Sequence, residues 1–204
     1  MPETPYLREP GYALRYRDDR FRTGSGPATD VRERRALRRL LAHAGATTGR
    51  WLDAPCGAGR MSDELPPPVV QLDRDPAMVA AANGPGLRVC ASVNALPFAD
   101  DSFAGALCHR LLQHIPTPDE RVTILRELAR VTNGPIVVSF FDRLSLQHLR
   151  RCVRRRFGKR RSGRSAISRR ALRRELAAAG LQPTAVAALR RFVSDQTLVL
   201  CVRA

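Results

Sequence analysis

The chain has 204 residues, of which 44% are hydrophobic and 26% charged, and its formal net charge is +16. This length is enough for one globular domain with a buried core, and the composition excludes a disordered chain. The sequence holds no apolar run of about 18 residues and no apolar signal-peptide core, so we expect a cytoplasmic protein without a transmembrane segment.

The N-terminal 28 residues are polar and irregular, and they include Tyr12, Tyr16 and Arg20. Their polar aromatic composition, ahead of the first expected helix, suggests a segment that folds over a binding site. We therefore expect residues 1–28 to form a lid or cap within a single domain of residues 1–204.

A helix is expected over residues 29–45. Thr29 or Asp30 can cap its N-terminus, and Glu33 follows at the spacing of a capping box. Leucines then recur at helical spacing, and Gly45 ends the pattern.

Short apolar strands then alternate with helices. The strands are expected at residues 50–54, 69–72, 87–91, 103–108 and 136–141. The helices are expected at residues 60–65, 75–84 and 118–132. Continuous apolar strands that alternate with helices indicate a parallel sheet covered on both faces, which is the doubly wound α/β class.

The last third of the chain combines an arginine-rich insertion with a hairpin. Residues 143–174 hold many arginines and no acid, and a helix is expected over residues 169–179. Two strands, at residues 183–189 and 197–203, are close enough to form a hairpin.

Lys159 is the only lysine of the chain, so the coding bias of a GC-rich genome explains the basic charge as well as a polyanionic partner does. Both interpretations stay open.

The cysteines do not suggest a metal or disulfide framework. The chain has five of them, widely spaced and without a Cys-x-x-Cys pair: Cys56, Cys90, Cys108, Cys152 and Cys201. This pattern argues against a zinc site, and no metal is expected.

The loop after the first strand carries the strongest functional signal. Asp53 ends the strand, and Gly57 and Gly59 follow in a turn that lets the backbone approach a ligand closely. Asp73 ends the next strand, about 20 residues further on, where a carboxylate can accept hydrogen bonds from both ribose hydroxyls. The combination predicts a nucleotide-type cofactor. A nicotinamide-dependent oxidoreductase is disfavoured because Ser62 replaces the third glycine of the dinucleotide fingerprint.

The loop LDAPCGAGR instead resembles the glycine-rich motif of class I S-adenosylmethionine-dependent methyltransferases. The segments QLDRDPAMVAAA, ASVNALPFADDSFAGALCHRLLQHI and RELARVTNGPIVVSFFD are similar to later blocks of that family, in order and spacing, from Trp51 to Asp142. The closest similarity is to the type 11 small-molecule group, which includes ubiquinone and menaquinone biosynthesis methyltransferases. The resemblance implies a Rossmann-like sheet, mostly parallel with an antiparallel C-terminal strand, and S-adenosylmethionine as the cofactor.

The resemblance also implies a set of cofactor-binding residues. They are Asp53, Ala54, Pro55, Gly57, Gly59, Asp73, Arg74, Met78, Ser92, Val93 and Cys108. Asp53 and Gly57 would contact the methionine part of the cofactor, and Asp73 the ribose. Adenine would lie against Met78, with Ser92 and Val93 near its amino group, and Cys108 or His109 would lie beneath the methyl donor.

Two of these positions depart from the pattern of the family. Many relatives have Asp where this chain has Ser92, and Pro55 removes one N–H donor from the loop. Plain structural roles also remain open, because Asp53 could cap the turn and Met78 could be a core residue.

Two histidines, His109 and His114, are candidates for the catalytic base, because they lie at and after the C-terminal end of a strand. A structural role for His114 is equally open.

The acceptor is expected to be a small molecule, and the arginines of residues 150–174 favour an anionic one, phosphorylated or lipid-linked. RNA is less favoured, since Phe157 is the only aromatic residue of that segment. The alternative is a catalytically inactive protein that binds a polyanion, either RNA or a membrane surface.

Overall fold

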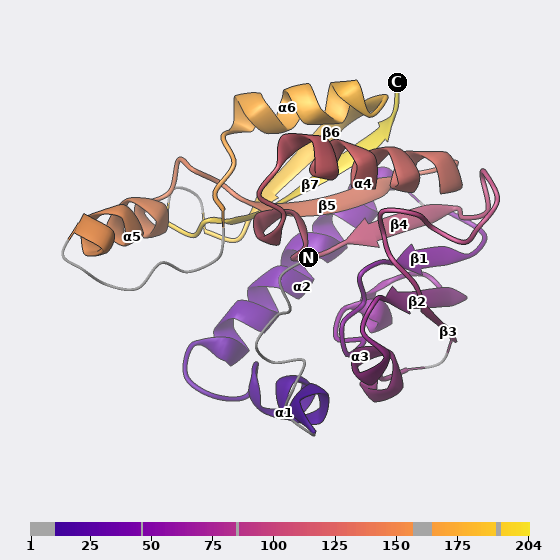
Figure 1. Cartoon of the computed structure of the whole chain (residues 1–204), viewed down its shortest axis with the longest axis horizontal. Helices are drawn as coiled ribbons and strands as arrows, with labels where there is room; N and C mark the ends of the chain where they lie inside the picture. Colours follow the sequence, from indigo (N-terminus) through magenta and orange to yellow (C-terminus); the bar gives the residue numbers. More distant parts are fainter. Residues whose placement is uncertain (1–10, 46, 85, 157–164, 191–192) are drawn as a thin grey trace.

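A computed structural model describes residues 11–45, 47–84, 86–156, 165–190 and 193–204. One sheet of seven strands, in the order β3-β2-β1-β4-β5-β7-β6, forms its centre (Figure 1). The strands are β1 (Trp51–Asp53), β2 (Val69–Asp73), β3 (Leu87–Cys90), β4 (Gly105–Cys108), β5 (Ile136–Phe141), β6 (Leu181–Ala188) and β7 (Gln196–Arg203). The pairs β5–β7 and β7–β6 are antiparallel, and all other strand pairs of this sheet are parallel. The predicted fold class and the C-terminal hairpin are confirmed.

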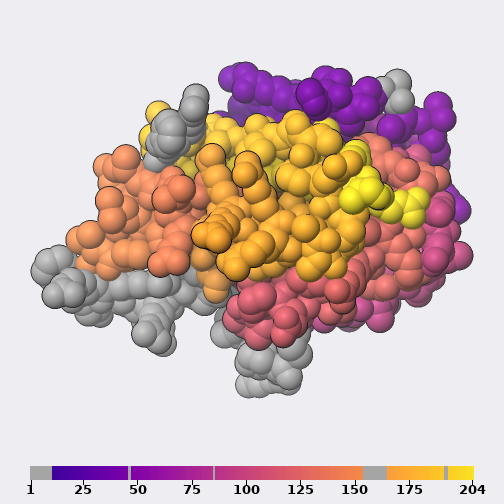
Figure 2. Space-filling view, turned by 90° about the horizontal axis from the view of Figure 1, so that it is seen from above, coloured from indigo at the N-terminus to yellow at the C-terminus, as the bar shows by residue number. Residues whose placement is uncertain are grey.

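Helices cover both faces of this sheet. They are α1 (Tyr12–Asp19), α2 (Gly26–Ala44), α3 (Pro76–Ala81), α4 (Pro118–Val131), α5 (Leu146–Arg156) and α6 (Arg169–Ala178), with two short 3₁₀ helices, η2 (Ser62–Glu64) and η3 (Leu112–His114). Figure 2 shows the C-terminal part of the chain lying between α2 on one side and the α4 region on the other. Within the described residues, no helix has the length and apolar character needed to cross a membrane.

The two faces of the sheet bury alternate residues of the same strands. Trp51, Leu107 and Val137 point to the face covered by α2, and they pack with Leu37 and Leu40 of that helix. Their neighbours in sequence point to the opposite face, where they pack against α4 and α6. Because successive side chains of a strand alternate, a strand that is covered on both faces must be almost entirely apolar, as β5 is except for Ser139.

Some predicted helices begin or end elsewhere. Residues 60–65 form turns and η2 instead of a helix, because three prolines follow at once and the residue before a proline avoids the helical region. The helix predicted at residue 29 begins at Gly26, and Pro27 lies in its first turn, a position that suits proline. The polar segment before it contains α1 and is therefore not irregular.

The strand order reverses between β1 and β4. The chain passes from β1 to β2 and β3 on one side, and from β4 to β5 on the other. In open α/β sheets, ligands bind outside the carboxyl ends of the strands at such a point. The end of β1, at Asp53, therefore marks where a ligand site is expected.

Candidate functional site

The glycine loop connects the carboxyl ends of β1 and β2. The backbone N–H of Gly57 donates to Asp73 Oδ2 at 2.9 Å, and that of Asp75 donates to Asp73 Oδ1 at 3.0 Å. The hydroxyl of Ser62 donates to Asp53 Oδ2 at 2.6 Å. Both carboxylates are thereby held at the carboxyl ends of the neighbouring strands β1 and β2, where Asp53 pairs with Gln71, two residues before Asp73.

These two carboxylates are both buried. Burial raises the pKa of Asp53 to about 7, and the nearby charge of Asp73 adds to this, while the Ser62 hydroxyl and Arg60 oppose it. Burial also raises the pKa of Asp73, against the backbone donors of Asp75 and Gly57. Among the described residues, no cation forms a salt bridge with either group. A ligand that brings positive charge would therefore stabilise both ionised forms.

The two glycines of the loop have different surroundings. Both have left-handed φ angles, +54° at Gly57 and +75° at Gly59. A Cβ added at Gly57 would meet open space, whereas one at Gly59 would lie 2.7 Å from the backbone nitrogen of Asn83. Gly59 is thus needed for packing against the segment that follows α3, and Gly57 borders open space.

Helix α1 packs against this loop. Ala13 forms a small buried cluster with Ala58 of the loop and Ala81 of α3, and Tyr12 and Met78 pack at its edge. The buried Tyr12 hydroxyl has no hydrogen-bond partner. Helix α1 of the N-terminal segment therefore contacts both the loop and α3, and residues 1–10 of that segment are outside the described part.

The other residues expected to bind the cofactor differ in their exposure to solvent. Ala54 and Cys108 are fully buried, and burial raises the pKa of the Cys108 thiol to about 12. Val93 is also buried, whereas Ser92 and Arg74 are exposed, and the Ser92 hydroxyl accepts only from the backbone of Asn94, at 3.3 Å. Pro55 is half-buried in the loop.

The two candidate bases differ in environment. His109 follows β4, is buried, and its Nε2 has no hydrogen-bond partner; this atom lies 3.8 Å from Glu33 Oε1. Burial holds the pKa of His109 well below its usual range, and Arg60 and Arg110 add to the effect. His114 ends η3 and is exposed.

A buried ionic network beside His109 was missed by the sequence analysis. Glu33, fully buried on α2, accepts from Arg60 at 2.5 Å and from Arg110 at 2.9 Å, instead of completing a capping box. The guanidinium of Arg60 lies 3.9 Å from the ring centroid of Phe21. Glu33 lies at i, i+4 and i+7 spacing with the buried Leu37 and Leu40, a pattern that places it on the buried face.

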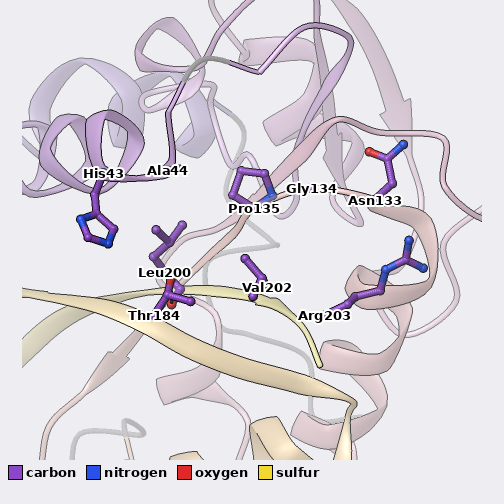
Figure 3. A pocket seen from close by; sticks show the side chains of 9 residues that line it. All are labelled: His43, Ala44, Asn133, Gly134, Pro135, Thr184, Leu200, Val202 and Arg203. Carbon is purple, nitrogen blue, oxygen red and sulfur yellow. Dashed lines mark hydrogen bonds between the residues drawn. The ribbon is translucent and has the colours of Figure 1, made fainter.

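Two cavities lie at opposite ends of the strands. One, of about 420 Å³, opens between the end of α2, the turn before β5 and the strands of the hairpin; Figure 3 shows His43 and Thr184 on one side of it and Asn133 and Arg203 on the other. The second, of about 290 Å³, lies at the carboxyl end of β5, where Arg110 and Phe141 line it. Only the second is at the edge where α/β sheets bind their ligands.

Comparison with solved structures finds this fold in known methyltransferases. The chain is similar to magnesium protoporphyrin IX methyltransferase from Synechocystis PCC 6803 with bound SAH, with 16% identity, coverage of 98% of this chain and 97% of that one, and a TM-score of 0.74. It is also similar to a SAM-dependent methyltransferase from Thermotoga maritima, with 18% identity, 95% and 94% coverage and a TM-score of 0.67. A third likeness is to a S-adenosylmethionine-dependent methyltransferase from Clostridium acetobutylicum, with 10% identity, 95% and 97% coverage and a TM-score of 0.69. At these identities the likeness establishes the fold.

The fold, with its antiparallel β7 and its glycine loop at the strand-order reversal, is that of a class I methyltransferase. Residues 52–135, from β1 to the start of β5, match the family model described as "Methyltransferase domain". This matched segment and the shared fold make the chain similar to the class I S-adenosylmethionine-dependent methyltransferases. No curated protein sequence matches the chain.

Proposed function

We propose that the glycine loop and Asp73 bind S-adenosylmethionine, and that the protein transfers its methyl group to a small-molecule or anionic acceptor. The observation that carries this proposal is the pair of buried carboxylates, Asp53 and Asp73, without a salt-bridge partner in the described part of the chain. S-adenosylmethionine carries an amino group and a sulfonium, both positive, beside a ribose whose hydroxyls can donate to a carboxylate. When bound, it supplies an already activated methyl group.

The residue roles follow from this fit. Asp53 would hold the positive methionine end, and Asp73, whose oxygens already accept from the loop backbone, would accept from the ribose. Gly57 leaves space for the ligand beside the loop. Met78 would lie against the adenine, with Ser92 and Val93 at its edge. Ala54, Pro55, Gly59, Arg74 and Cys108 would shape the site around these contacts.

His109 is better placed than His114 to act as a base. Its pKa is held low, so the ring is neutral near pH 7 and can accept a proton from an acceptor hydroxyl or amine at Nε2. The Glu33 carboxylate, 3.8 Å away, would stabilise the imidazolium that results. The remaining task of the protein is alignment of donor and acceptor, which can contribute several kcal/mol.

The N-terminal segment would act as a lid within one methyltransferase domain of residues 1–204. The packing of α1 against Ala58 and α3 supports this, because a ligand at the loop would lie beneath that helix. Closure over the cofactor would keep water away from the reacting groups.

An anionic acceptor was expected from the arginine-rich segment. Its residues 157–164, which include Lys159 and Phe157, lie outside the described part, so the support comes from its flanks and from the cavity at the carboxyl end of β5. The competing function is an inactive protein that binds a polyanion, favoured only by the net charge of +16.

One set of titrations tests the proposal. Purified protein is titrated calorimetrically with S-adenosylmethionine, SAH and NAD, and labelled methyl transfer into a metabolite extract and an RNA extract is then measured. We expect both adenosyl compounds to bind, NAD not to bind, and label to enter small molecules. Asp73→Ala should weaken adenosyl binding strongly. Salt-sensitive polyanion binding without affinity for SAH would instead establish the competing function.

A further inference from the structure

The cavity at the carboxyl end of β5 has a strongly basic lining. Five arginines line it: Arg20, Arg32, Arg110, Arg151 and Arg190. They come from the α1–α2 connection, α2, the segment just after β4, α5 and the start of the β6–β7 connection, so segments distant in sequence meet there. Gathering like charges around one cavity is costly unless something of opposite charge enters it.

Most of this charge is not neutralised by the protein. The one acidic residue in the lining, Asp195, forms a salt bridge with Arg151, and Arg110 pairs with Glu33 behind the cavity wall. The other three arginines have no salt-bridge partner among the described residues: Arg20, Arg32 and Arg190. The cavity therefore has a net positive charge.

A buried amide in the same lining is also unpaired. Gln196, at the start of β7, is only 2% exposed, and neither its side-chain nitrogen nor its oxygen has a hydrogen-bond partner. An unpaired buried amide costs about 1–3 kcal/mol, so such groups usually indicate a missing partner. A ligand with both accepting and donating atoms would satisfy it.

Arg110 is held toward this cavity in a strained conformation. Its φ of +59° is left-handed, which is rare for a residue with a side chain. Its backbone N–H donates to the Ser139 hydroxyl at 2.7 Å, and its carbonyl accepts from the Gln113 amide at 2.7 Å. The structure thus maintains an arginine at the end of β4 at some cost in backbone energy.

We propose that this cavity binds the methyl acceptor and recognises a carboxylate or phosphate group on it. The proposal rests on the proposed function for the cofactor site. Arg110 and Arg32 would bind the anionic group, since a guanidinium donates to such oxygens in pairs, and Gln196 would bind a polar group beside it. The volume of about 290 Å³ suits a small molecule and is too small for a nucleic-acid strand.

The distance between strands limits the length of an acceptor that fits this cavity. From the end of β4 to the start of β7, which runs antiparallel, is two strand spacings, or about 10 Å. An acceptor that reaches from His109 to Gln196 therefore has its anionic group within about 10 Å of the atom that loses a proton. This favours a compact acid over a long-chain one.

The test uses the full-length protein and simple anions. Benzoate, phenyl phosphate and the neutral benzamide are titrated into SAH-saturated protein at low salt, and binding is followed by calorimetry. We expect one or both anions to bind and benzamide to bind at least tenfold more weakly. The preferred anion distinguishes a carboxylate acceptor from a phosphate acceptor.

Two variants and a matched control identify the site. Arg32→Gln should weaken anion binding about tenfold, whereas Arg88→Gln, which removes the same charge from the exposed edge strand β3, should change it less than about twofold. Gln196→Leu should weaken binding without lowering thermal stability, because the amide it removes is unpaired. SAH affinity should stay the same in all three variants.

The outcomes separate this inference from the proposed function. If SAH binds but neither anion does, or if Arg88→Gln weakens anion binding as much as Arg32→Gln, the acceptor-pocket proposal is wrong and the cofactor proposal stands. If SAH itself fails to bind, the proposed function is wrong. Titration of the anions without SAH then shows whether the cavity binds an anionic group.

Discussion

The backbone N–H of Gly57 donates to the Asp73 carboxylate at 2.9 Å, across 16 residues of sequence. This bond connects the glycine loop after β1 to the end of β2, so the two parts of the proposed cofactor site are positioned by each other. Asp53 lies on the neighbouring strand, buried and with its pKa raised to about 7. The first prediction follows from that raised pKa.

S-adenosylmethionine should bind more tightly at pH 8 than at pH 6. A bound cation favours the ionised Asp53, so binding requires the carboxyl to lose its proton, which is unfavourable below its pKa of about 7. We expect affinity about tenfold weaker at pH 6 than at pH 8, measured by calorimetry, with protons released on binding.

Asp53→Asn is the control for this pH dependence. Its affinity should be weaker and should lose the tenfold change, because no carboxyl titrates there. Since the folded pKa of Asp53 is raised to about 7, the folded protein loses stability as the pH rises from about 4 to about 7, and the full loss remains at pH 8. The cofactor-free variant should therefore melt higher than wild type at pH 8. An unchanged pH profile in Asp53→Asn would show that another group is responsible.

Substitution of the two loop glycines should separate binding from folding. Gly57→Ala places a Cβ in open space, so the protein should fold with a loss of about 1–2 kcal/mol from the left-handed φ and with much weaker SAH binding. Gly59→Ala pushes a Cβ against Asn83 and should cost up to about 3 kcal/mol more. Denaturant unfolding and SAH titration measure the two effects; equal stability of the variants would contradict the assignment.

Loosening α1 should shorten the residence time of the cofactor. Tyr12 packs against the cluster that joins α1 to the loop, so Tyr12→Ala should raise the dissociation rate of SAH about tenfold. Leu14, 48% exposed on the same helix, provides the matched control, and Leu14→Ala should leave the rate unchanged. Stopped-flow displacement measures both rates. If deletion of residues 1–25 also leaves affinity and turnover unchanged, the lid proposal fails.

His109→Asn should reduce methyl transfer far more than His114→Asn does. Loss of a general base typically costs 10²–10⁴-fold in rate, and SAH affinity should be retained. Because the pKa of His109 is well below 6.5, the wild-type rate should show no loss from its protonation between pH 8 and pH 6.5. Labelled methyl transfer into the extract measures both variants, and a larger loss in His114→Asn would reverse the assignment.

A buried ion pair should make a large contribution to stability. Arg121 of α4 and Glu175 of α6 are almost fully buried and pair at 2.5 Å, and Arg121 also donates to the carbonyl of Ile115. Glu175→Gln leaves the arginine charge uncompensated and should cost about 3–5 kcal/mol in urea unfolding. Arg203→Gln, which breaks an exposed pair with Asp101, should cost less than about 1 kcal/mol.

Much of the fold could be predicted because its signals are local. The apolar runs of β2 and β5 predict buried parallel strands, and Asp75 before Pro76 predicts the start of α3, where the Asp75 carboxylate accepts from the N–H of Ala77 at 3.0 Å. The helix predicted over residues 60–65 failed because the following prolines outweigh a weak local preference. Helix α1 was missed because its sequence is mostly polar and only its packing on the loop stabilises it.

The sequence by itself determined the class of fold, the place of the cofactor loop and the pairing of that loop with Asp73, since strand, turn and acid follow one another in a short stretch of chain. Only the tertiary structure decided which distant residues meet. It joined Glu33 of α2 to Arg110, which is 77 residues away, and placed Gln196 beside arginines from four other segments. Such contacts depend on how helices and strands pack across the sheet, and sequence spacing carries no information about them. For that reason the donor side of the reaction could be inferred from a motif, whereas the acceptor side required the fold.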